Sequence, residues 1–162
     1  MHRPNPTLGR KIGFVPAATI LMLSFLSGCG GDPYAGYYAK TKPNQQWFVG
    51  EWTLQPGSPG SSQSRPTKLT LQADGSFRAV NYPAPALGSL GAGAAFVDGE
   101  GTWGVGPHQF FWVIGVRWVK VGTNQVDYGD MLPILNDKPP HVLHHIIGDP
   151  DSGQALVFEK AK

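Results

Sequence analysis

Three histidines close to two aspartates form the group of residues best suited to metal chemistry. His141, His144 and His145 precede Asp149 and Asp151, and imidazole and carboxylate are both common metal ligands. Side chains alternate between the faces of a strand, so His141 and His145 share one face and His144 takes the other. At a rise of ~3.3 Å per residue, the two on one face would be about 13 Å apart, too far to hold one ion. We therefore expect no metal site, and instead expect surface histidines beside a turn.

The other candidate catalytic groups lack the surroundings that catalysis needs. Asp149 and Asp151 lie in a turn sequence whose local hydrogen bonding explains them, and we interpret Asp127 and Asp130 in the same way. Exposed turns provide neither a cleft nor a shifted pKa. No serine lies in a Gly-x-Ser-x-Gly elbow, and residues 88–93 are not followed by the Lys-Ser/Thr of a phosphate-binding loop. The sequence predicts a protein that is not an enzyme and holds no cofactor.

The N-terminal segment has the layout of a secretory signal. Arg3, Arg10 and Lys11 are followed by an uncharged, mostly apolar run over residues 12–26. That run is too short to span a bilayer comfortably, which takes about 20 residues. A basic region, a short apolar region and small residues before a cleavage site are typical of a signal peptide. We predict a signal peptide over residues 1–28.

Residues 26–29, Leu-Ser-Gly-Cys, resemble the lipobox of bacterial lipoproteins. In that family the cysteine receives a diacylglyceryl group, cleavage occurs just before it, and the new amine is usually acylated. Cys29 is the only cysteine of the chain, so it has no disulfide partner in its own chain. The resemblance implies a protein anchored by lipid at Cys29 in the cell envelope. Because Gly30 follows rather than Asp, it also implies the outer membrane if the host is Gram-negative.

The chain that would remain after cleavage is nearly neutral. Removing Arg3, Arg10 and Lys11 leaves 10 basic and 11 acidic residues, a net charge of −1. Nothing strongly basic remains to attract a phosphate backbone, so we expect no nucleic-acid partner. Residues 29–46 are rich in Gly, Pro and polar residues and are predicted to be a flexible tether. Its tyrosines either rest at the lipid interface or belong to a merely flexible linker; they are Tyr34, Tyr37 and Tyr38.

Residues 47–162 have the pattern of one all-β domain. Short apolar or alternating runs are separated by turn residues, and 22 Gly and 15 Pro disfavour a helical bundle. The clearest hairpin signal is Asp74-Gly75 between two alternating runs. The run over 109–121 is either one strand bent at Gly115 or two. We therefore predict about eight or nine strands in a small antiparallel up-and-down barrel or a strongly curled sheet, over residues 48–55, 67–72, 76–82, 99–105, 109–121, 127–135, 140–147 and 154–159.

Three short motifs resemble those of small bacterial lipocalin-like domains. They are Gly50-Glu51-Trp52, the hairpin from Leu69 through Asp74-Gly75 to Phe77, and a second Gly-x-Trp element, Gly101-Thr102-Trp103. The resemblance covers about residues 48–160 and implies a compact antiparallel barrel. That fold carries unrelated functions, so the class of ligand stays open.

The most apolar strand suggests where a ligand or a partner could bind. Residues 110–114 are apolar on both faces, so the outward face is either covered, for example by the loop over residues 87–96, or exposed for docking. Arg117 either stacks on the ring of Trp52 or points to water while Trp52 packs in the core. The candidate ligand-binding residues are Trp52, Leu87, Leu90, Phe96, Trp103, Phe111 and Arg117.

Three functions remain open at this point. The first is a non-catalytic, lipid-anchored barrel that binds an apolar small molecule or a lipid, with the loop over 87–96 as a lid; an enclosed pocket of about 300 Å³ or more favours it. The second is an envelope protein-interaction module, an inhibitor, immunity or assembly factor, which a filled barrel with an exposed aromatic strip favours. The third is a metal-dependent enzyme, which would need His and Asp side chains to converge.

Overall fold

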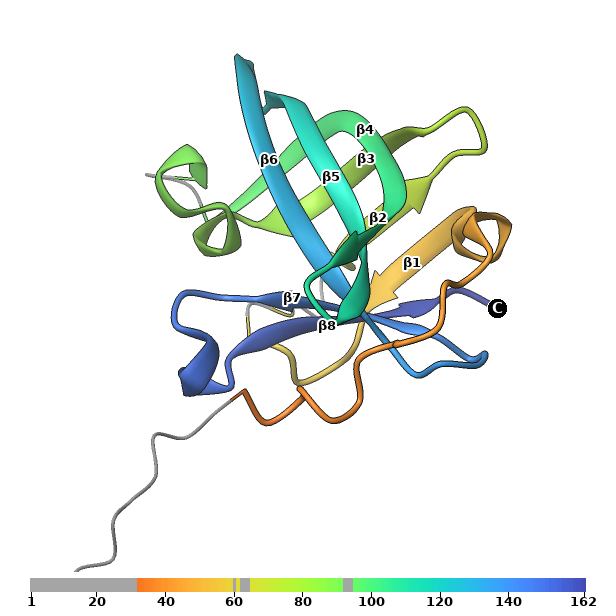
Figure 1. Ribbon diagram of the computed structural model, residues 1–162. Coiled ribbons are helices and arrows are strands. Elements are labelled where there is room, and N and C mark those ends of the chain that lie inside the picture. The colour runs from red at the N-terminus through yellow and green to blue at the C-terminus, as the bar shows by residue number, and fades with distance from the viewer. Residues whose placement is uncertain (1–31, 60, 62–64, 92–94) are drawn as a thin grey trace, which may run out of the picture.

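A closed antiparallel barrel of eight strands forms the body of the protein. The computed structural model describes residues 32–59, 61, 65–91 and 95–162, so the predicted signal peptide and Cys29 lie outside the described residues. Figure 1 shows the strands following one another in chain order, and the first strand pairs with the last. The predicted all-β, lipocalin-like up-and-down barrel is confirmed, and the open curled sheet is wrong.

The strands lie close to the ranges predicted from their sequence patterns. The run predicted as one strand or two is a single strand that continues through Gly115. At the predicted Asp74-Gly75 turn, Gly75 has a φ of 83° and Oδ1 of Asp74 accepts the N–H of Ser76. The strands are β1 (Gly50–Leu54), β2 (Lys68–Leu71), β3 (Ser76–Pro83), β4 (Phe96–His108), β5 (Phe111–Val121), β6 (Asn124–Leu135), β7 (Val142–Ile146) and β8 (Ala155–Lys160).

Large side chains fill the interior of the barrel. An eight-stranded barrel is about wide enough for its inward side chains to fill it. The largest of these side chains are less than 2% exposed, and aromatic residues are prominent among them. They include Trp52, Phe77, Tyr82, Trp118 and Phe158. The interior is therefore mainly a packed core.

Two glycines of β4 make room for this aromatic core. A Cβ on Gly101 would lie 2.0 Å from the backbone oxygen of Arg117 and 2.7 Å from the ring of Phe77. A Cβ on Gly99 would lie 2.6 Å from the ring of Trp118. Only glycine allows such close approach, so the glycine of the second Gly-x-Trp motif has a packing role.

Residues 32–49, called the N-terminal segment below, pack against the barrel. Ala39 is 0% exposed. Its N–H donates to the oxygen of Ile134 and its oxygen accepts the N–H of Trp112, at 2.7 and 2.9 Å. The segment thus lies between the start of β5 and the end of β6, and pairs backbone groups that would otherwise be unsatisfied. The predicted flexible tether is wrong for residues 32–46.

The helical elements of the described residues are three short 3-10 helices, η1 (Gln45–Phe48), η2 (Ala84–Gly91) and η3 (Pro150–Ser152). None of the helices in the described ranges has the length and apolar character needed to cross a bilayer. Leu87 of η2 is 1% exposed and packs in the core, and η2 contacts β3 and β4. Leu87 therefore packs inside the barrel and does not cover the outward face of the apolar strand, and residues 92–94 of the predicted lid lie outside the described residues.

Candidate functional site

The pairing between β6 and β7 has the shortest register in the barrel. Their register contains only the pairs of Ile134 with Leu143 and of Leu135 with Val142, although β6 has 12 residues. Figure 1 shows β6 running away from β7 and β8. Most of β6 therefore has no β7 partner along one edge, and side chains near its centre can be reached from the side of the barrel.

A pocket of about 560 Å³ lies where the two strands separate. We call it the β6–β7 pocket. Its walls come from the N-terminal segment, the turn between β4 and β5, β6, and the end of β7. The lining residues are Asp32, Ala35, Tyr38, Lys40, His108, Gln109, Phe110, Phe111, Asp130, Met131, Pro133, His145, Ile146 and Gly148. Most of this surface is apolar, with a few polar groups, as in typical small-molecule sites.

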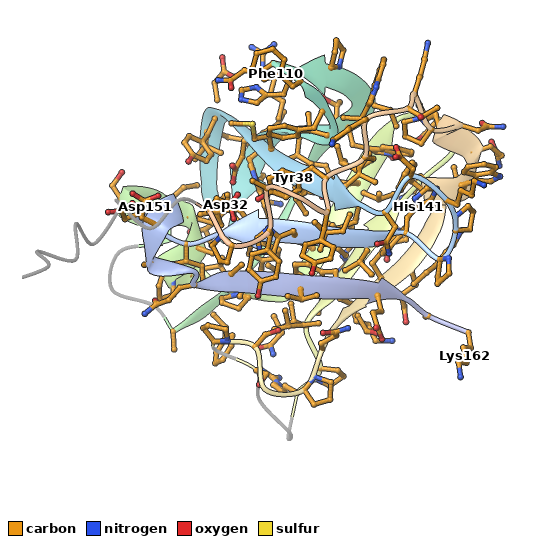
Figure 2. All side chains as sticks on the ribbon, turned by 60° about the horizontal axis from the view of Figure 1, so that its bottom comes forward. Asp32, Tyr38, Phe110, His141, Asp151 and Lys162 are labelled. Atoms are coloured by element: carbon orange, nitrogen blue, oxygen red, sulfur yellow. The ribbon has the colours of Figure 1, made fainter. Side chains whose placement is uncertain are left out.

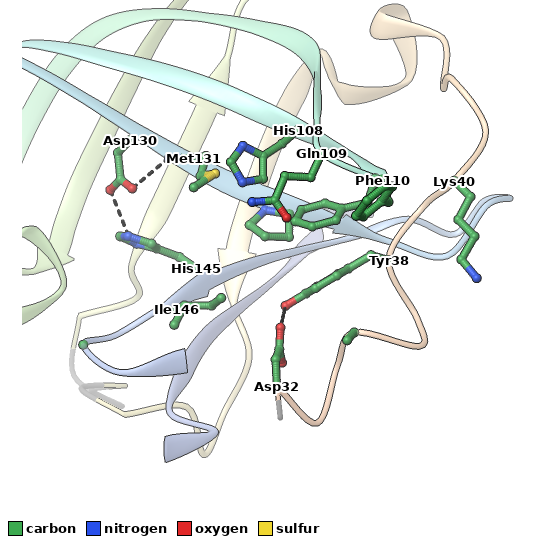
Figure 3. Close-up of a pocket in the computed structure, with 14 residues that line it drawn as sticks. Asp32, Tyr38, Lys40, His108, Gln109, Phe110, Asp130, Met131, His145 and Ile146 are labelled. Atoms are coloured by element: carbon green, nitrogen blue, oxygen red, sulfur yellow. Dashed lines mark hydrogen bonds and ion pairs between the residues drawn. The ribbon is translucent and has the colours of Figure 1, made fainter. Parts of the chain in front are cut away.

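A chain of three polar side chains, two of them buried, reaches this pocket from the core. The hydroxyl oxygen of Tyr82 lies 2.5 Å from Nδ1 of His145, and Nε2 of His145 lies 2.9 Å from Oδ2 of Asp130 (Figure 3). The side chains of His145 and Asp130 are 4% and 15% exposed. Burial raises the pKa of Tyr82 well above its usual value, so the phenol stays protonated. In the neutral imidazole, Tyr82 then donates to Nδ1, and the proton on Nε2 faces Asp130.

A second carboxylate–tyrosine–histidine group joins the N-terminal segment to β7. The Tyr38 hydroxyl donates to the carboxylate of Asp32 (Figure 3) and lies 3.4 Å from Nδ1 of His144. The ring of Tyr34 packs on His144, with centroids 4.1 Å apart. Burial is the main cause that raises the pKa of Tyr38, and burial lowers the pKa of His144 below its usual value.

The third histidine belongs to a different part of the barrel. His141 packs between Trp47 and Phe48, with ring centroids 5.3 and 5.2 Å away. It lines a second pocket of about 640 Å³, called the His141 pocket below. Figure 2 places His141 well away from Asp32 and Tyr38.

The three histidines are 6%, 1% and 3% exposed in chain order, so the predicted surface histidines are wrong. Within the described part of the chain, no group of three or more His, Cys, Asp or Glu residues could hold a metal ion. Asp149 caps its turn as predicted, since its Oδ1 accepts the N–H of Asp151.

The predicted ligand-binding residues do not gather at one site. Phe111 lines the β6–β7 pocket and Trp52 lines the His141 pocket. Leu87 and Trp103 are buried in the core, and Phe96 is half-buried opposite Pro83 in the sheet. The side chain of Leu90 lies outside the described part.

The predicted stacking of Arg117 on Trp52 is wrong. Nε and Nη2 of Arg117 donate to the two carboxylate oxygens of Asp127, at 2.6 and 2.7 Å, on the outside of the sheet. The indole N–H of Trp52 donates to the oxygen of Phe48 inside the barrel. The alternative, a core tryptophan and an arginine at the surface, is therefore confirmed.

The N-terminal segment also covers much of the apolar start of β5. The rings of Tyr38 and Phe111, on the outward face, lie 4.6 Å apart. The Lys42 ammonium lies over Trp112 at 5.8 Å, on the face that packs against the core. Phe110, at the preceding turn, remains 88% exposed. The outward face is therefore covered here by a part of the chain that the sequence pattern did not connect with it.

No protein-family model matches this chain, and no significant match is found among curated proteins or solved structures. Function must therefore be inferred from the site itself. The central polar residues of that site, Tyr82, His145 and Asp130, were not predicted as a group. The sequence does contain one indication that Asp130 faces inward: the alternation within β6 places it on the same face as Leu132 and Ile134.

Proposed function

We propose that this protein is a non-catalytic lipoprotein of the cell envelope whose β6–β7 pocket binds an apolar small molecule or a lipid chain. The observation that carries the proposal is the pocket of about 560 Å³ at the place where β6 and β7 separate. Its volume is within the range of small-molecule sites. Phe111, Met131, Pro133 and Ile146 supply apolar walls, and burying a ligand chain against them is favourable.

The position of the predicted anchor supports the same proposal. Asp32 lines the pocket, and Cys29 precedes it by three residues. Three residues span at most about 11 Å when fully extended. A lipid attached at Cys29 would therefore hold the pocket close to the membrane surface. Phe110 and Tyr37, which are 88% and 66% exposed, would then meet the interfacial region that aromatic side chains favour.

Native mass spectrometry of the full chain, purified in detergent from its native host, tests both the lipid anchor and the ligand site. The mass of the N-terminal peptide reports whether Cys29 carries acyl chains. Incubation with tetradecanol reports binding as an added mass. We expect lipidated Cys29 and one bound tetradecanol. An unmodified Cys29 that still follows residues 1–28 would overturn the anchor, and the absence of bound tetradecanol would overturn the ligand site.

A pair of variants assigns the binding to the β6–β7 pocket. Met131 and Val119 are both 40% exposed on strands, but only Met131 lines this pocket. Met131→Arg puts a charge on its apolar wall, so we expect the apparent affinity for tetradecanol to fall by about tenfold or more. Val119→Arg should leave binding unchanged. Equal binding by the two variants would show that the alcohol is bound elsewhere.

The second candidate function is docking of an envelope protein through the exposed aromatic turn. It is favoured by the 88% exposure of Phe110, since an exposed aromatic side chain can anchor a partner by filling one of its pockets. Phe110→Ser should then abolish co-purification of a stoichiometric partner from the host, whereas Val119→Arg, on another exposed site, should leave it unchanged. Purification without any partner from wild-type cells would argue against docking.

A further inference from the structure

We propose that the β6–β7 pocket selects amphiphiles whose head group donates hydrogen bonds and carries a positive charge, such as a long-chain primary amine. The inference rests on the proposed function, because it requires an apolar chain in the pocket. It adds the class of head group that the polar end of the pocket takes, and it names Asp130 as the residue that binds this group.

Asp130 is a carboxylate on an otherwise apolar face. Its neighbours on the inward face of β6, Leu132 and Ile134, are 2% and 0% exposed. The Asp130 side chain keeps 15% exposure where it lines the pocket. A carboxylate that is largely removed from water is costly unless it is paired and hydrogen-bonded.

The chain itself supplies only part of that pairing. Oδ1 accepts the N–H of Met131 at 2.7 Å, and Oδ2 lies 2.9 Å from Nε2 of His145. That second contact is close but not aligned as a hydrogen bond, since Oδ2 has no hydrogen-bond partner among the described residues. Across the described ranges, the ion pairs give Asp130 no lysine or arginine. A ligand that brings a cation would complete the site.

His145 is fixed in place and cannot serve a ligand as a free donor. The Tyr82 hydroxyl holds Nδ1 at 2.5 Å, and this directs Nε2 toward Asp130. His145 is therefore a positioning residue that keeps the carboxylate at the inner end of the pocket. The polar surface that remains for a head group at this end accepts hydrogen bonds.

Asp32 agrees with this polarity, whereas Lys40 is a cation in the same lining. Asp32 is a second carboxylate in the lining and accepts the hydroxyl of Tyr38. Lys40 also lines the pocket, but in the described part of the chain no ion pair joins it to either carboxylate. A carboxylate head group would bring a like charge next to Asp130, whereas an ammonium would form an ion pair there.

Three ligands that share one chain length test the head group directly. The full chain in detergent is incubated separately with tetradecylamine, tetradecanol and tetradecanoate, and the bound fraction is measured by native mass spectrometry. We expect the amine to bind about tenfold or more tightly than the carboxylate, with the alcohol between them. Binding of tetradecanoate as tight as that of the amine would overturn the inference and leave the proposed function standing. If none of the three binds, the proposed function itself fails.

A charge-neutral variant assigns the preference to Asp130. Asp130→Asn keeps the shape of the side chain and removes its charge, so we expect the ratio of amine to alcohol affinity to fall about tenfold. Asp127→Asn is the control, because Asp127 lies on the same strand but binds Arg117 on the outer surface. It should leave the ratio unchanged. Thermal unfolding checks that both variants fold. If Asp130→Asn does not fold, the comparison of the three ligands on the wild-type chain still decides the inference.

Discussion

His144 shows how burial sets a charge state in this protein. Its pKa is lowered mainly by burial and further by the electrostatic influence of His145, and the carboxylate of Asp32 opposes both effects. The folded protein therefore favours the neutral ring. The Tyr34 ring and the Tyr38 hydroxyl lie against it, so protonation would place a charge inside a packed contact.

This lowered pKa predicts a stability loss in weak acid. The ordinary pKa of histidine is 6.5, so the unfolded chain takes up a proton as pH falls through that value while the folded chain resists. The stability that the neutral His144 ring gives the folded protein is complete above the ordinary pKa of histidine. It is lost as pH falls toward the lower pKa of His144 in the folded state. We expect Tm to fall between pH 7.5 and pH 5.5 by thermal unfolding, and His144→Phe to reduce that fall. His108→Phe, at a half-buried site, is the control. An identical fall in His144→Phe and wild type would contradict this account.

At the residue scale, sequence reasoning located the chemical groups but misjudged their surroundings. The alternation of His144 and His145 across the strand was predicted from the period of a strand, and the two side chains have different partners in the structure. Their burial was not predicted, because it depends on Tyr34, Tyr38 and Tyr82, which are distant in sequence. Asp130 lies within β6 and not in an exposed turn, on the face that its alternation with Leu132 and Ile134 predicts.

At the scale of elements, the N-terminal segment acts as an extra, short strand. Tyr38 forms a bridge with Leu135, and Ala39 bonds to both β5 and β6. The segment also contributes Asp32, Tyr38 and Lys40 to the β6–β7 pocket. The alternation of residues within one strand could not predict this. The segment fills the gap between the start of β5 and the end of β6, and both strands lie far from it in the sequence.

Ala39 tests whether this segment is part of the fold. Ala39→Arg places a charged side chain at a position that is 0% exposed, so we expect the free energy of unfolding to fall by about 2–4 kcal/mol. Ala35→Arg lies in the same segment at an exposed position and should change stability by less than about 0.5 kcal/mol. Urea unfolding measures both. No loss of stability in Ala39→Arg would indicate that the segment is a free tether.

Gly101 tests the packing of the β4 glycines. A Cβ there would lie 2.0 Å from the backbone oxygen of Arg117, and neither strand can move away without breaking the sheet. We expect Gly101→Ala to lower the free energy of unfolding by about 2–4 kcal/mol. Gly104→Ala has nothing within 4 Å of its Cβ and should be nearly neutral. Equal stability of the two variants by urea unfolding would show that the sheet tolerates the added atom.

At the scale of the whole molecule, closure of the barrel removes the exposed sheet edges except where strands separate. The eight-stranded architecture followed from alternating runs and turn residues, of which the Asp74-Gly75 hairpin is the clearest. The position of the pocket could not be predicted in the same way. It depends on β6 extending beyond its pairing with β7, and a pattern within one strand carries no information about where its neighbour ends.

The whole-molecule arrangement makes the pocket lateral rather than axial. Trp52, Tyr82 and Trp118 fill the interior, and the β6–β7 pocket opens at the side, on the part of the barrel where the N-terminal segment begins. A ligand from a membrane would therefore reach the pocket near the predicted anchor, without passing through the core.

Photoaffinity labelling tests the ligand site most directly. Cells of the native host that produce the full chain are exposed to tetradecylamine that carries a diazirine near the end of its chain and are irradiated, and the protein is then purified, digested and analysed by peptide mass spectrometry. We predict labels on residues of the β6–β7 pocket, Phe111, Met131 and Ile146, and loss of these labels in Met131→Arg. Labels confined to Trp47 and Trp52 of the His141 pocket, or labels that Met131→Arg does not reduce, would contradict the assignment of the ligand to the parted strands.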